Sequence, residues 1–328
     1  MKAALIEREG SGLVLGEIPV PEAAAGEVRI RIIGTSVNFA DVMMERGLYH
    51  SPRSRPFVLG MDAYGLVDAR GEPGSGPPPG TPVVAFPSGS YAEYALVDAR
   101  LLVPAPTGVS REALQGIGLV GCTAYELLTR AGGLRPGESV LVHAAAGGVG
   151  SLLVQMARLL GAKTVIGQVG HPEKVDLVYG LGADRVLTDP PASWAGIVQE
   201  VTEGRGVDLV LNALQGETLA QDIASLADFG RLVVYGQAAG AAGYVSGGAI
   251  YPKNQRVVGY SFGHIRRARP ELVAPVLRTV LGWLDGGRIR VPVGGRFPLA
   301  RAAEAVNLVA SGRSTGKVLV DVMANSGR

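Results

Sequence analysis

The residues from Val142 to Gly150, VHAAAGGVG, place three glycines directly after a short apolar run. A turn that holds a pyrophosphate needs glycines, because side chains would keep the backbone N–H groups away from the phosphate oxygens. A helix that starts behind the turn adds a favourable dipole. Against the pattern G-x-G-x-x-G the stretch gives Ala145, Gly147 and Gly150, with alanine in place of the first glycine. The pattern predicts a dinucleotide-binding turn, and a plain strand-to-helix turn is the alternative.

The end of the next strand-like segment, about 20 residues further on, distinguishes two cofactors. NAD-binding units place Asp or Glu there, where the carboxylate binds the ribose 2′-OH. Here Gln168 and Gly170 stand at the strand end, and Lys174 follows. A lysine would meet the 2′-phosphate of NADPH, so NADPH is favoured and NADH stays an alternative. The simpler interpretation makes Lys174 an ordinary exposed lysine on a helix.

The elements around this turn alternate between short apolar runs and helical patterns, beginning near Pro136. Val/Leu/Ile runs of this kind are typical of a parallel sheet covered on both faces. The helix behind the glycine turn is expected at 149–160. Six runs match the strand count of a doubly wound fold: SVLVHA, KTVIGQ, RVLTD, VDLVLN, RLVVYG and RVVGYS. We therefore predict an α/β chain with a Rossmann domain over residues 123–262.

The segments on either side of that domain have a different texture. Residues up to about 120 contain alternating segments such as EVRIRIIG and YAEYALV, which predict strands. The stretch GEPGSGPPPG predicts an exposed loop. Helical patterns at 270–284 and 300–311 precede an apolar strand, KVLVDV. We place that strand back in the first domain, so residues 1–122 and 263–328 are predicted to form one β-rich domain.

Composition excludes several classes of protein. The 328 residues suffice for about two domains, and a net charge of +2 argues against nucleic acid or an anionic membrane as the main partner. Cys122 is the single cysteine, which rules out an internal disulfide and a cysteine-based zinc site. No apolar run reaches the length of about 18 residues that a membrane helix needs. The charged start MKAALIEREG is unlike a secretory signal, so we expect a cytoplasmic protein that acts on a small molecule.

Four motifs together resemble the zinc-independent quinone oxidoreductases of the medium-chain dehydrogenase/reductase superfamily. They are HAAAGGVG, GCTAYE, VNFADVMMERGLY and STGKVLV, and their order and spacing match along nearly the whole chain. The resemblance implies a GroES-like catalytic domain made from both chain ends, a central Rossmann domain and a cleft between them. It also implies NADPH as cofactor and a homodimer. The chain departs from the family at Asp62, where relatives usually have Glu, and at Asp189, where a tyrosine often stacks on the adenosine end.

The resemblance assigns site residues position by position. Asn38 and Asp41 match the family's N-x-x-D segment beside the nicotinamide, and Tyr49 matches the tyrosine that borders the substrate. Thr123 matches a threonine near the nicotinamide ring. Asn38 and Tyr49 are thereby the implied catalytic residues. The other implied cofactor-binding residues are Gly147, Gly148, Val149 and Gly150 at the pyrophosphate, Lys174 at the ribose phosphate, and Arg313 and Lys317 near the C-terminal strand.

Each of these residues also has a structural alternative. Asn38 and Asp41 would serve as caps of the helix that DVMMER begins. Tyr49 would fit a half-buried position with a solvated hydroxyl. Thr123 would cap a helix formed by AYELLTR.

A catalytic zinc is not expected. Zinc-dependent relatives bind the metal with Cys, His and Glu, but Met61 stands where their histidine would be. The four histidines are scattered at positions 50, 143, 171 and 264, as surface or hydrogen-bonded structural histidines are. Without a Lewis acid, the charge that develops in the reaction must be stabilised by hydrogen bonds or delocalised by the substrate itself. The sequence therefore predicts hydride transfer from NADPH to a conjugated acceptor such as a quinone or an enone.

Two other functions stay open. In enoyl-thioester reductases of the same superfamily, a tyrosine at the position matching Tyr49 is implicated as proton donor, so an enoyl-CoA or related thioester is an alternative acceptor. The basic segments SPRSRPF and HIRRARP would then meet CoA phosphates, although solvated surface arginines are the commoner explanation of such segments. The second alternative is a catalytically silent protein that only binds NADPH.

Overall fold

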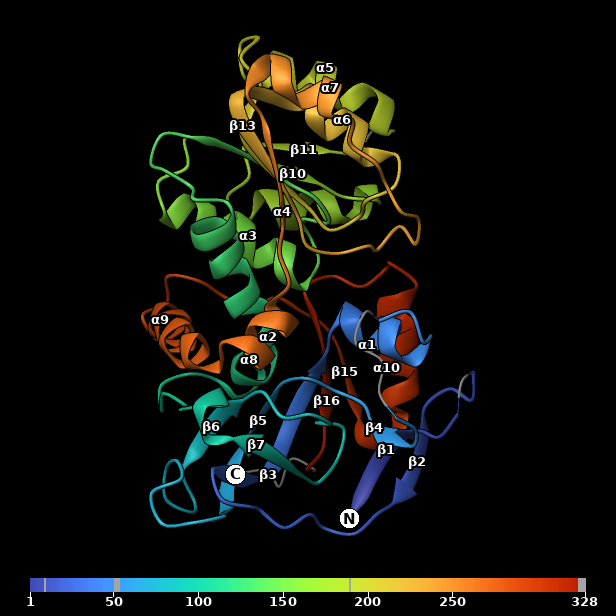
Figure 1. Cartoon of the computed structure of the whole chain (residues 1–328), viewed down its shortest axis with the longest axis vertical. Coiled ribbons are helices and arrows are strands. Elements are labelled where there is room, and N and C mark those ends of the chain that lie inside the picture. The colour runs from blue at the N-terminus through green and yellow to red at the C-terminus, as the bar shows by residue number, and fades with distance from the viewer. Residues whose placement is uncertain (9, 50–53, 189, 324–328) are drawn as a thin grey trace. The chain divides into compact units, whose positions relative to one another are not determined.

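The computed structural model describes residues 1–8, 10–49, 54–188 and 190–323 (Figure 1). The chain divides into two compact units. The central unit is Thr123–Phe262, and the terminal unit combines Met1–Cys122 with Gly263–Arg328. The chain passes from the terminal into the central unit within helix α2, Arg111–Glu126.

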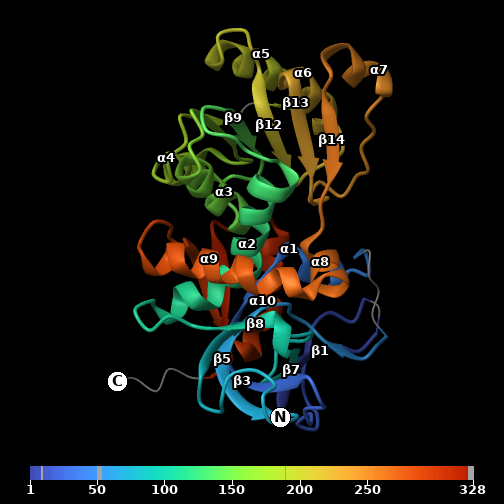
Figure 2. The same ribbon diagram turned by 60° about the vertical axis from the view of Figure 1, so that its left-hand side comes forward.

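The central unit contains a six-stranded parallel sheet in the order β11-β10-β9-β12-β13-β14, several strands of which are seen in Figure 2. All six apolar runs form strands, and the predicted doubly wound fold is confirmed. The strands are β9 (Ser139–Val142), β10 (Thr164–Gln168), β11 (Arg185–Leu187), β12 (Val207–Asn212), β13 (Leu226–Val234) and β14 (Arg256–Gly259). The α-helices are α3 (Gly148–Leu159), α4 (Val175–Tyr179), α5 (Pro191–Val201), α6 (Thr218–Ser225) and α7 (Gly247–Ile250).

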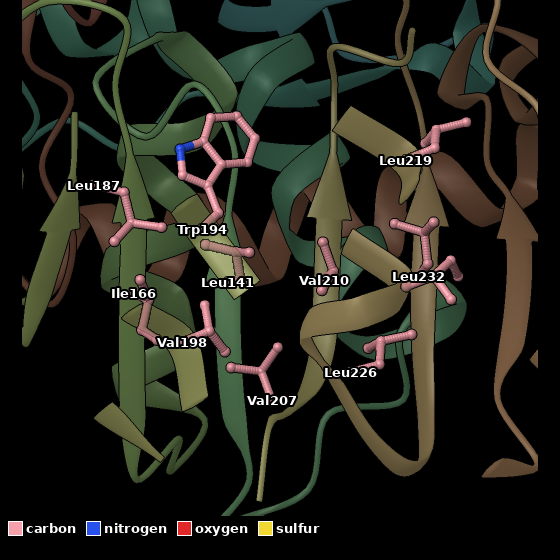
Figure 3. Packing of buried hydrophobic residues seen from close by; sticks show 11 residues of the cluster. Leu141, Ile166, Leu187, Trp194, Val198, Val207, Val210, Leu219, Leu226 and Leu232 are labelled. Carbon is pink, nitrogen blue, oxygen red and sulfur yellow. The ribbon is translucent and has the colours of Figure 1, made fainter. Parts of the chain in front are cut away.

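Apolar side chains of this sheet pack against the helices beside it (Figure 3). Leu141, Ile166 and Val210 come from three strands, and Trp194 and Val198 come from α5; all five are buried. Removing such a side chain from water contributes about 1.5–3 kcal/mol. All four consecutive residues of β9 are buried, so both faces of the sheet are covered there, as a continuous apolar run predicts.

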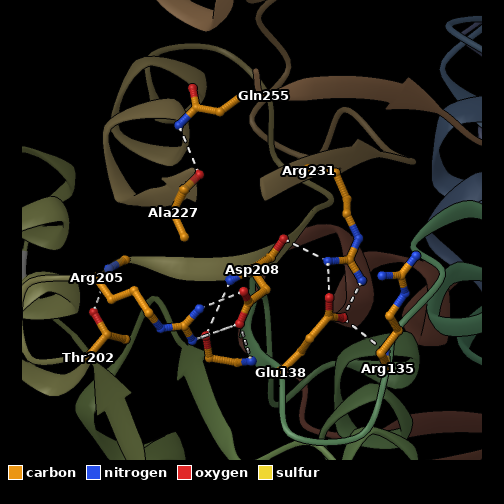
Figure 4. A network of polar contacts seen from close by, with 10 residues as sticks. Arg135, Glu138, Thr202, Arg205, Asp208, Ala227, Arg231 and Gln255 are labelled. Carbon is orange, nitrogen blue, oxygen red and sulfur yellow. Dashed lines mark hydrogen bonds and ion pairs between the residues drawn. The ribbon is translucent and has the colours of Figure 1, made fainter. Parts of the chain in front are cut away.

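A polar network ties the amino ends of the strands together (Figure 4). Ser139 donates its hydroxyl to Asp208 at 2.8 Å, and Arg205 donates to the same carboxylate at 2.7 Å. Arg231 donates to Glu138 at 2.6 Å and to the carbonyl of Asp208 at 2.9 Å. These contacts join β9, β12 and β13 at the edge opposite to the glycine turn.

The terminal unit is built on two sheets. One has the order β15-β16-β3-β5-β6-β8, with β7 also paired to β3, and the other has the order β2-β1-β4. Residues Val28, Ile30 and Ile32 alternate along β3 and enter the core, as a half-buried strand requires. The strands are β1 (Lys2–Ile6), β2 (Val14–Glu17), β3 (Glu27–Val37), β4 (Phe57–Val58), β5 (Ala63–Arg70), β6 (Pro82–Ala85), β7 (Tyr94–Asp98), β8 (Leu102–Pro104), β15 (Val293–Pro298) and β16 (Lys317–Asp321).

The elements of the terminal unit differ from the prediction at one helix and one strand. The α-helices are α1 (Phe39–Glu45), α8 (Phe262–Ala268), α9 (Val273–Asp285) and α10 (Ala302–Ala310), besides the first part of α2. A helix beginning at AYELLTR is wrong, because α2 starts at Arg111 and runs through the glycine-rich GIGLVG. β15 was not predicted, since its sequence VGGRFP carries two glycines and a proline. The predicted loop over residues 71–80 contains no helix or strand.

Candidate functional site

The glycine turn predicted from the sequence lies between β9 and α3. β9 ends at Val142, and α3 begins at Gly148 with Gly147 as its N-cap. Ala144 has a left-handed backbone conformation (φ 48°), and its carbonyl oxygen accepts the N–H of Gly147 at 2.8 Å. No side chain caps α3 within the described part of the chain. The first N–H groups of this helix are therefore placed to bind an anion.

Gly150 is the position of the turn with no room for a side chain. A Cβ atom there would lie 2.2 Å from the carbonyl oxygen of Ala144 and 2.7 Å from the Cα atom of Ala145. Both are backbone atoms, so the turn itself would have to move. A Cβ atom on Gly147 would lie 3.2 Å from the same carbonyl oxygen, which is also tight. Glycine at these two positions lets α3 start against the strand, as a phosphate-binding turn requires.

The end of β10 carries an amide in place of an acid. The carbonyl of Gln168 accepts the N–H of Ala145 at 2.8 Å, and its Oε1 accepts the N–H of Ala144 at 3.3 Å. Lys174 follows in a short 3-10 helix and is 7% exposed. Burial lowers the pKa of its ammonium, and the carboxylate of Glu173 opposes this effect. Lys174 is therefore not the exposed lysine of the simpler interpretation.

β9 and β12 are neighbours in the sheet, and the strand order reverses between them. In open parallel sheets a dinucleotide binds at the carboxyl ends of the strands, at such a reversal. The glycine turn follows the carboxyl end of β9, so its place in the central unit fits that rule. Asp189, one of the two departures from the family pattern, lies outside the described residues.

In the terminal unit, three contacts occupy the side chain of Asn38. Its Oδ1 accepts a hydrogen bond from Nζ of Lys317 at 2.8 Å. Its Nδ2 donates to Asp62 at 3.1 Å and to the carbonyl of Ser36 at 3.3 Å. Lys317 also donates to the carbonyl of Val37 at 2.7 Å and is 2% exposed. The ammonium of Lys317 is thus directed at the start of α1.

Asp41 is buried at the same helix start. Its Oδ2 accepts the N–H of Asn38 at 2.8 Å and the hydroxyl of Tyr91 at 3.3 Å. Burial raises the pKa of Asp41 to about 7, with Asp62 adding to the rise and the N–H of Asn38 and the charge of Lys317 opposing it. Burial also lowers the pKa of Lys317, which the two carboxylates oppose. The contact to Asn38 is the capping contact that the structural alternative predicted for Asp41.

Two members of this buried cluster were not predicted as site residues. Asp62 accepts the hydroxyl of Ser36 at 3.2 Å and the N–H of Leu119 at 3.0 Å, and Tyr91 is completely buried. Burial raises the pKa of the Tyr91 hydroxyl well above its usual range. Asp62 did leave a signal, because a charged residue stands between apolar neighbours in LGMDAYG.

The other predicted site residues lie at separate places. Tyr49 follows α1 and is half-buried, as its structural alternative predicted. Arg313 is exposed in the connection between α10 and β16. Thr123 is half-buried inside α2, so a capping role for it is wrong. The structure therefore brings Asn38, Asp41 and Lys317 together, whereas Arg313 stands on a surface loop.

The basic segment HIRRARP is partly occupied by contacts within the terminal unit. Arg266 donates to the carbonyl of Met61 at 2.6 Å and lies 5.7 Å from the centre of the Phe86 ring. Arg269 pairs with Glu271 at 2.5 Å. In the other basic segment, SPRSRPF, residues 51–53 lie outside the described part of the chain.

Neither a metal centre nor a membrane span emerges from the described residues. Within them, no three His, Cys, Asp or Glu side chains are grouped so that they could hold a metal ion. None of the helices described combines the length and the apolar character needed to cross a bilayer. Cys122 is a buried free thiol.

Comparison with known proteins gives matches in both parts of the chain. The family described as "Alcohol dehydrogenase GroES-like domain" matches residues 24–107, and the family described as "Zinc-binding dehydrogenase" matches residues 148–278. A solved mycobacterial quinone oxidoreductase is 33% identical with a TM-score of 0.86, over 98% of this chain and 100% of that one. The Escherichia coli quinone oxidoreductase, solved with NADPH, is 27% identical with a TM-score of 0.90, over the same shares.

Similar sequences also occur inside much longer proteins. Erythronolide synthase EryA2 of Saccharopolyspora erythraea is 35% identical over 90% of this chain, which spans 8% of that protein. A phenolphthiocerol/phthiocerol polyketide synthase protein of Mycobacterium tuberculosis is 30% identical over 90% of this chain, which spans 14% of that protein.

A GroES-like domain joined to a dinucleotide-binding domain defines a medium-chain dehydrogenase/reductase, a superfamily of oxidoreductases. The chain belongs to this superfamily as a quinone-oxidoreductase-like member, as its motifs predict.

Proposed function

We propose that the chain is a zinc-independent oxidoreductase that uses NADPH to reduce a conjugated acceptor, a quinone or an enone. The observation that carries this proposal is the start of α3, which no side chain of the described residues caps, behind a turn in which Gly150 has no room for a Cβ atom. Such a turn fits the pyrophosphate of a dinucleotide. The similar quinone oxidoreductase of Escherichia coli, solved with NADPH, supports the choice of cofactor.

The residues proposed to hold NADPH begin with the glycine turn. Gly147, Gly148, Val149 and Gly150 would bind the pyrophosphate, and Lys174 the 2′-phosphate, whose charge would stabilise a buried ammonium. Thr123 and Arg313 remain proposed contacts of the cofactor. When bound, NADPH supplies a hydride from its nicotinamide ring. NADH is the alternative donor.

Asn38, Asp41 and Lys317 were predicted to contact the cofactor, and Asn38 was also predicted to be catalytic; we now propose a more indirect action for their side chains. The amide of Asn38 is bonded to Lys317 and Asp62, and Asp41 accepts the N–H of Asn38. Asn38, Asp41 and Lys317 would therefore fix the backbone at the start of α1. That helix leads to Tyr49, which we propose as the proton donor to the substrate. Holding such a donor in place would raise the rate of the reaction, because proton transfer depends on geometry.

Reduction of an enoyl thioester is the second candidate function. The 35% identity to part of a polyketide synthase favours it, since the similarity covers 90% of this chain. This acceptor needs a proton at carbon after hydride addition, whereas a hydroquinone oxygen takes its proton from water. Tyr49→Phe should therefore abolish turnover of an enoyl-CoA and leave quinone turnover nearly unchanged. If Tyr49→Phe is as active as the wild type with both acceptors, Tyr49 is not the acid.

The first experiment measures oxidation of NADPH by the purified protein with a small quinone and with a short 2-enoyl-CoA, and with NADH in parallel. A higher kcat/KM for the quinone supports the leading proposal, and a higher value for the thioester supports the second. Tight binding of NADPH without oxidation by any acceptor would identify a silent binding protein. No binding of either cofactor would overturn all three.

We also propose a homodimer formed through the edge of the central sheet. β14 is an edge strand (Figure 2), and Val257 on it is 41% exposed. Tyr251, six positions earlier in the sequence, is 75% exposed. An unpaired strand edge is a template for pairing with a second copy across a two-fold axis. Light scattering should give the mass of a dimer for the wild type and of a monomer for Val257→Lys. Leu15→Lys, on the edge strand β2, is the matched control that should stay dimeric.

We further propose that the protein works in the cytoplasm, where NADPH is present and the buried thiol of Cys122 would stay reduced. Cell fractionation with an antibody against the chain tests this location.

A further inference from the structure

A chain of polar side chains is buried in the central unit. Nε2 of His143 lies 2.6 Å from Oδ1 of Asp222, and both side chains are completely buried. The other carboxylate oxygen of Asp222 accepts a hydrogen bond from Nδ2 of Asn212. That nitrogen also donates to Oγ1 of Thr218 at 2.8 Å. No pattern in the sequence predicted this network, because its histidine is one of four scattered along the chain.

The direction of each hydrogen bond follows from the surroundings. The ring of His143 lies against the indole of Trp194, with 5.1 Å between ring centres. Within the described residues Nδ1 of His143 has no hydrogen-bond partner, so a proton there would be buried without an acceptor. The proton shared with Asp222 therefore belongs on Nε2, and His143 is the donor. Asp222 then accepts from both sides, from His143 and from Asn212.

Both ends of the network lie where the strand order reverses. His143 directly follows β9 and precedes the glycine turn, and its N–H bonds the carbonyl of Leu211 at 3.0 Å. Asn212 is the last residue of β12. The network thus joins the carboxyl ends of the two strands between which a dinucleotide is expected.

The same network shapes the loop after β12. Oδ1 of Asn212 accepts the N–H groups of Leu214 and Gln215, both at 2.7 Å. Gln215 has a left-handed backbone (φ 62°), and its carbonyl accepts the hydroxyl of Thr218 at 2.9 Å. Its side chain donates to the carbonyl of Gly236 at 2.8 Å. A left-handed conformation at a residue other than glycine persists only where its surroundings hold it.

We propose that His143, Asn212 and Asp222 are positioning residues for the cofactor. They hold two segments at the carboxyl edge of the sheet, the glycine turn at 144–150 and the loop at 213–216, in the conformation that receives a dinucleotide before it binds. Preorganisation of this kind strengthens binding because less ordering remains to be done on association. The inference rests on the proposed function only in that NADPH is the ligand.

Variants that exchange hydrogen-bond donors and acceptors inside the network test this proposal. Asp222→Asn presents an amide that cannot accept from both His143 and Asn212, and Asn212→Asp places two carboxylates together. Each single variant should weaken NADPH binding by about tenfold or more in titration calorimetry, since tenfold corresponds to about 1.4 kcal/mol. The double exchange restores the donor-to-acceptor order from position 143 through 222 to 212, while Oγ1 of Thr218 must turn its proton from the carbonyl of Gln215 to the new carboxylate. The Kd of the double variant should therefore lie closer to that of the wild type than the Kd of either single variant.

A matched control separates positioning from general stability. Ser139→Ala removes a buried hydroxyl that bonds Asp208 from the amino end of the same strand, β9. It should lower the Tm while leaving the Kd for NADPH within about twofold of the wild type. If Ser139→Ala weakens NADPH as much as Asp222→Asn does, or if the folded single variants bind NADPH like the wild type, the network is only structural.

Two further measurements cover variants that fail to fold. Thr218→Val is nearly isosteric and should weaken NADPH by a smaller factor than Asp222→Asn. In the wild type without cofactor, hydrogen exchange at the amides of Leu214 and Gln215 should already be slow. Fast exchange that slows only when NADPH binds would refute preorganisation. Failure of the proposed function is distinguishable, because the wild type itself would then show no binding of NADPH.

Discussion

The ammonium of Lys317 donates a hydrogen bond to the amide oxygen of Asn38 at 2.8 Å, although 279 positions separate the two residues. This contact joins the first residue of β16 to the start of α1, both inside the terminal unit. It places a buried cation beside the carboxylates of Asp41 and Asp62, whose charges oppose the lowering of its pKa by burial. The matched motifs at the two chain ends are therefore physically one cluster.

Removing this cation should be costly. Lys317→Met leaves the carbonyl of Val37 and the amide oxygen of Asn38 without their donor and the two carboxylates without a counter-charge. Leaving buried polar and charged groups without their partner in this way typically costs about 3–5 kcal/mol. Urea denaturation should show a loss in the free energy of unfolding of that order. Lys163→Met, at an exposed position, is the control and should change it by no more than about 0.5 kcal/mol.

The raised pKa of Asp41 predicts an unusual dependence of stability on pH. Because the pKa is about 7 in the folded state and 3.8 ordinarily, the folded protein binds more protons than the unfolded chain between these values. The contribution of Asp41 is therefore fully present below about pH 4 and is lost as the pH rises through 7. Asp41→Asn should remove a slope of at most about 1.4 kcal/mol per pH unit from unfolding curves measured between pH 5 and 8. A wild type and variant with parallel pH profiles would contradict the raised pKa.

Asp208, in the polar network of Figure 4, should behave in the opposite way. Burial acts to raise its pKa, but hydrogen bonds from Arg205 and Ser139 prevail and lower it to about 2. The stability that this carboxylate contributes is present above about pH 4 and is lost as the pH falls toward 2. Thermal unfolding of Asp208→Asn should show a loss of about 1–2 kcal/mol at pH 7 that shrinks between pH 4 and 2. A constant difference across that range would mean that charge plays no part.

Gly150→Ala tests the glycine turn directly. The new Cβ atom would lie 2.2 Å from the carbonyl oxygen of Ala144, so the turn must shift and the binding of NADPH should weaken by about tenfold or more. The control is Gly196→Ala in α5, where a Cβ atom meets nothing within 4 Å. That change should leave the Kd unaltered and raise stability by about 0.4–1 kcal/mol. Calorimetry and a thermal scan measure both quantities.

The sequence predicted most of what depends on local pattern. The six apolar runs of the central unit are strands, and the glycine turn stands between β9 and α3. Both could be predicted because period, length and glycine spacing are properties of neighbouring residues. The partners of Asn38 were not predictable in this way. Its contacts to Lys317 and Asp62 join three separate segments, and nothing in any one of them specifies the other two.

The helix α2 shows why local rules also failed. Glycine lowers helix propensity, so the segment GIGLVG was not predicted as helical. In the folded chain these glycines admit neighbours: a Cβ atom on Gly116 would lie 2.9 Å from Val291, and one on Gly121 would lie 2.7 Å from Val280. Close packing of the helix against later parts of the terminal unit thus outweighs the intrinsic preference.

The pairing of β3 with β16 determines which of the two units can complete its fold first during synthesis on the ribosome. Val37 pairs with Val318, so the sheet of the terminal unit stays incomplete until the strand Lys317–Asp321 has been made. The central unit, one continuous segment, emerges entirely before that moment. Until Lys317 arrives, Asn38 and the carboxylates of Asp41 and Asp62 lack its charge. During synthesis, therefore, the unit that is begun first is completed after the central unit.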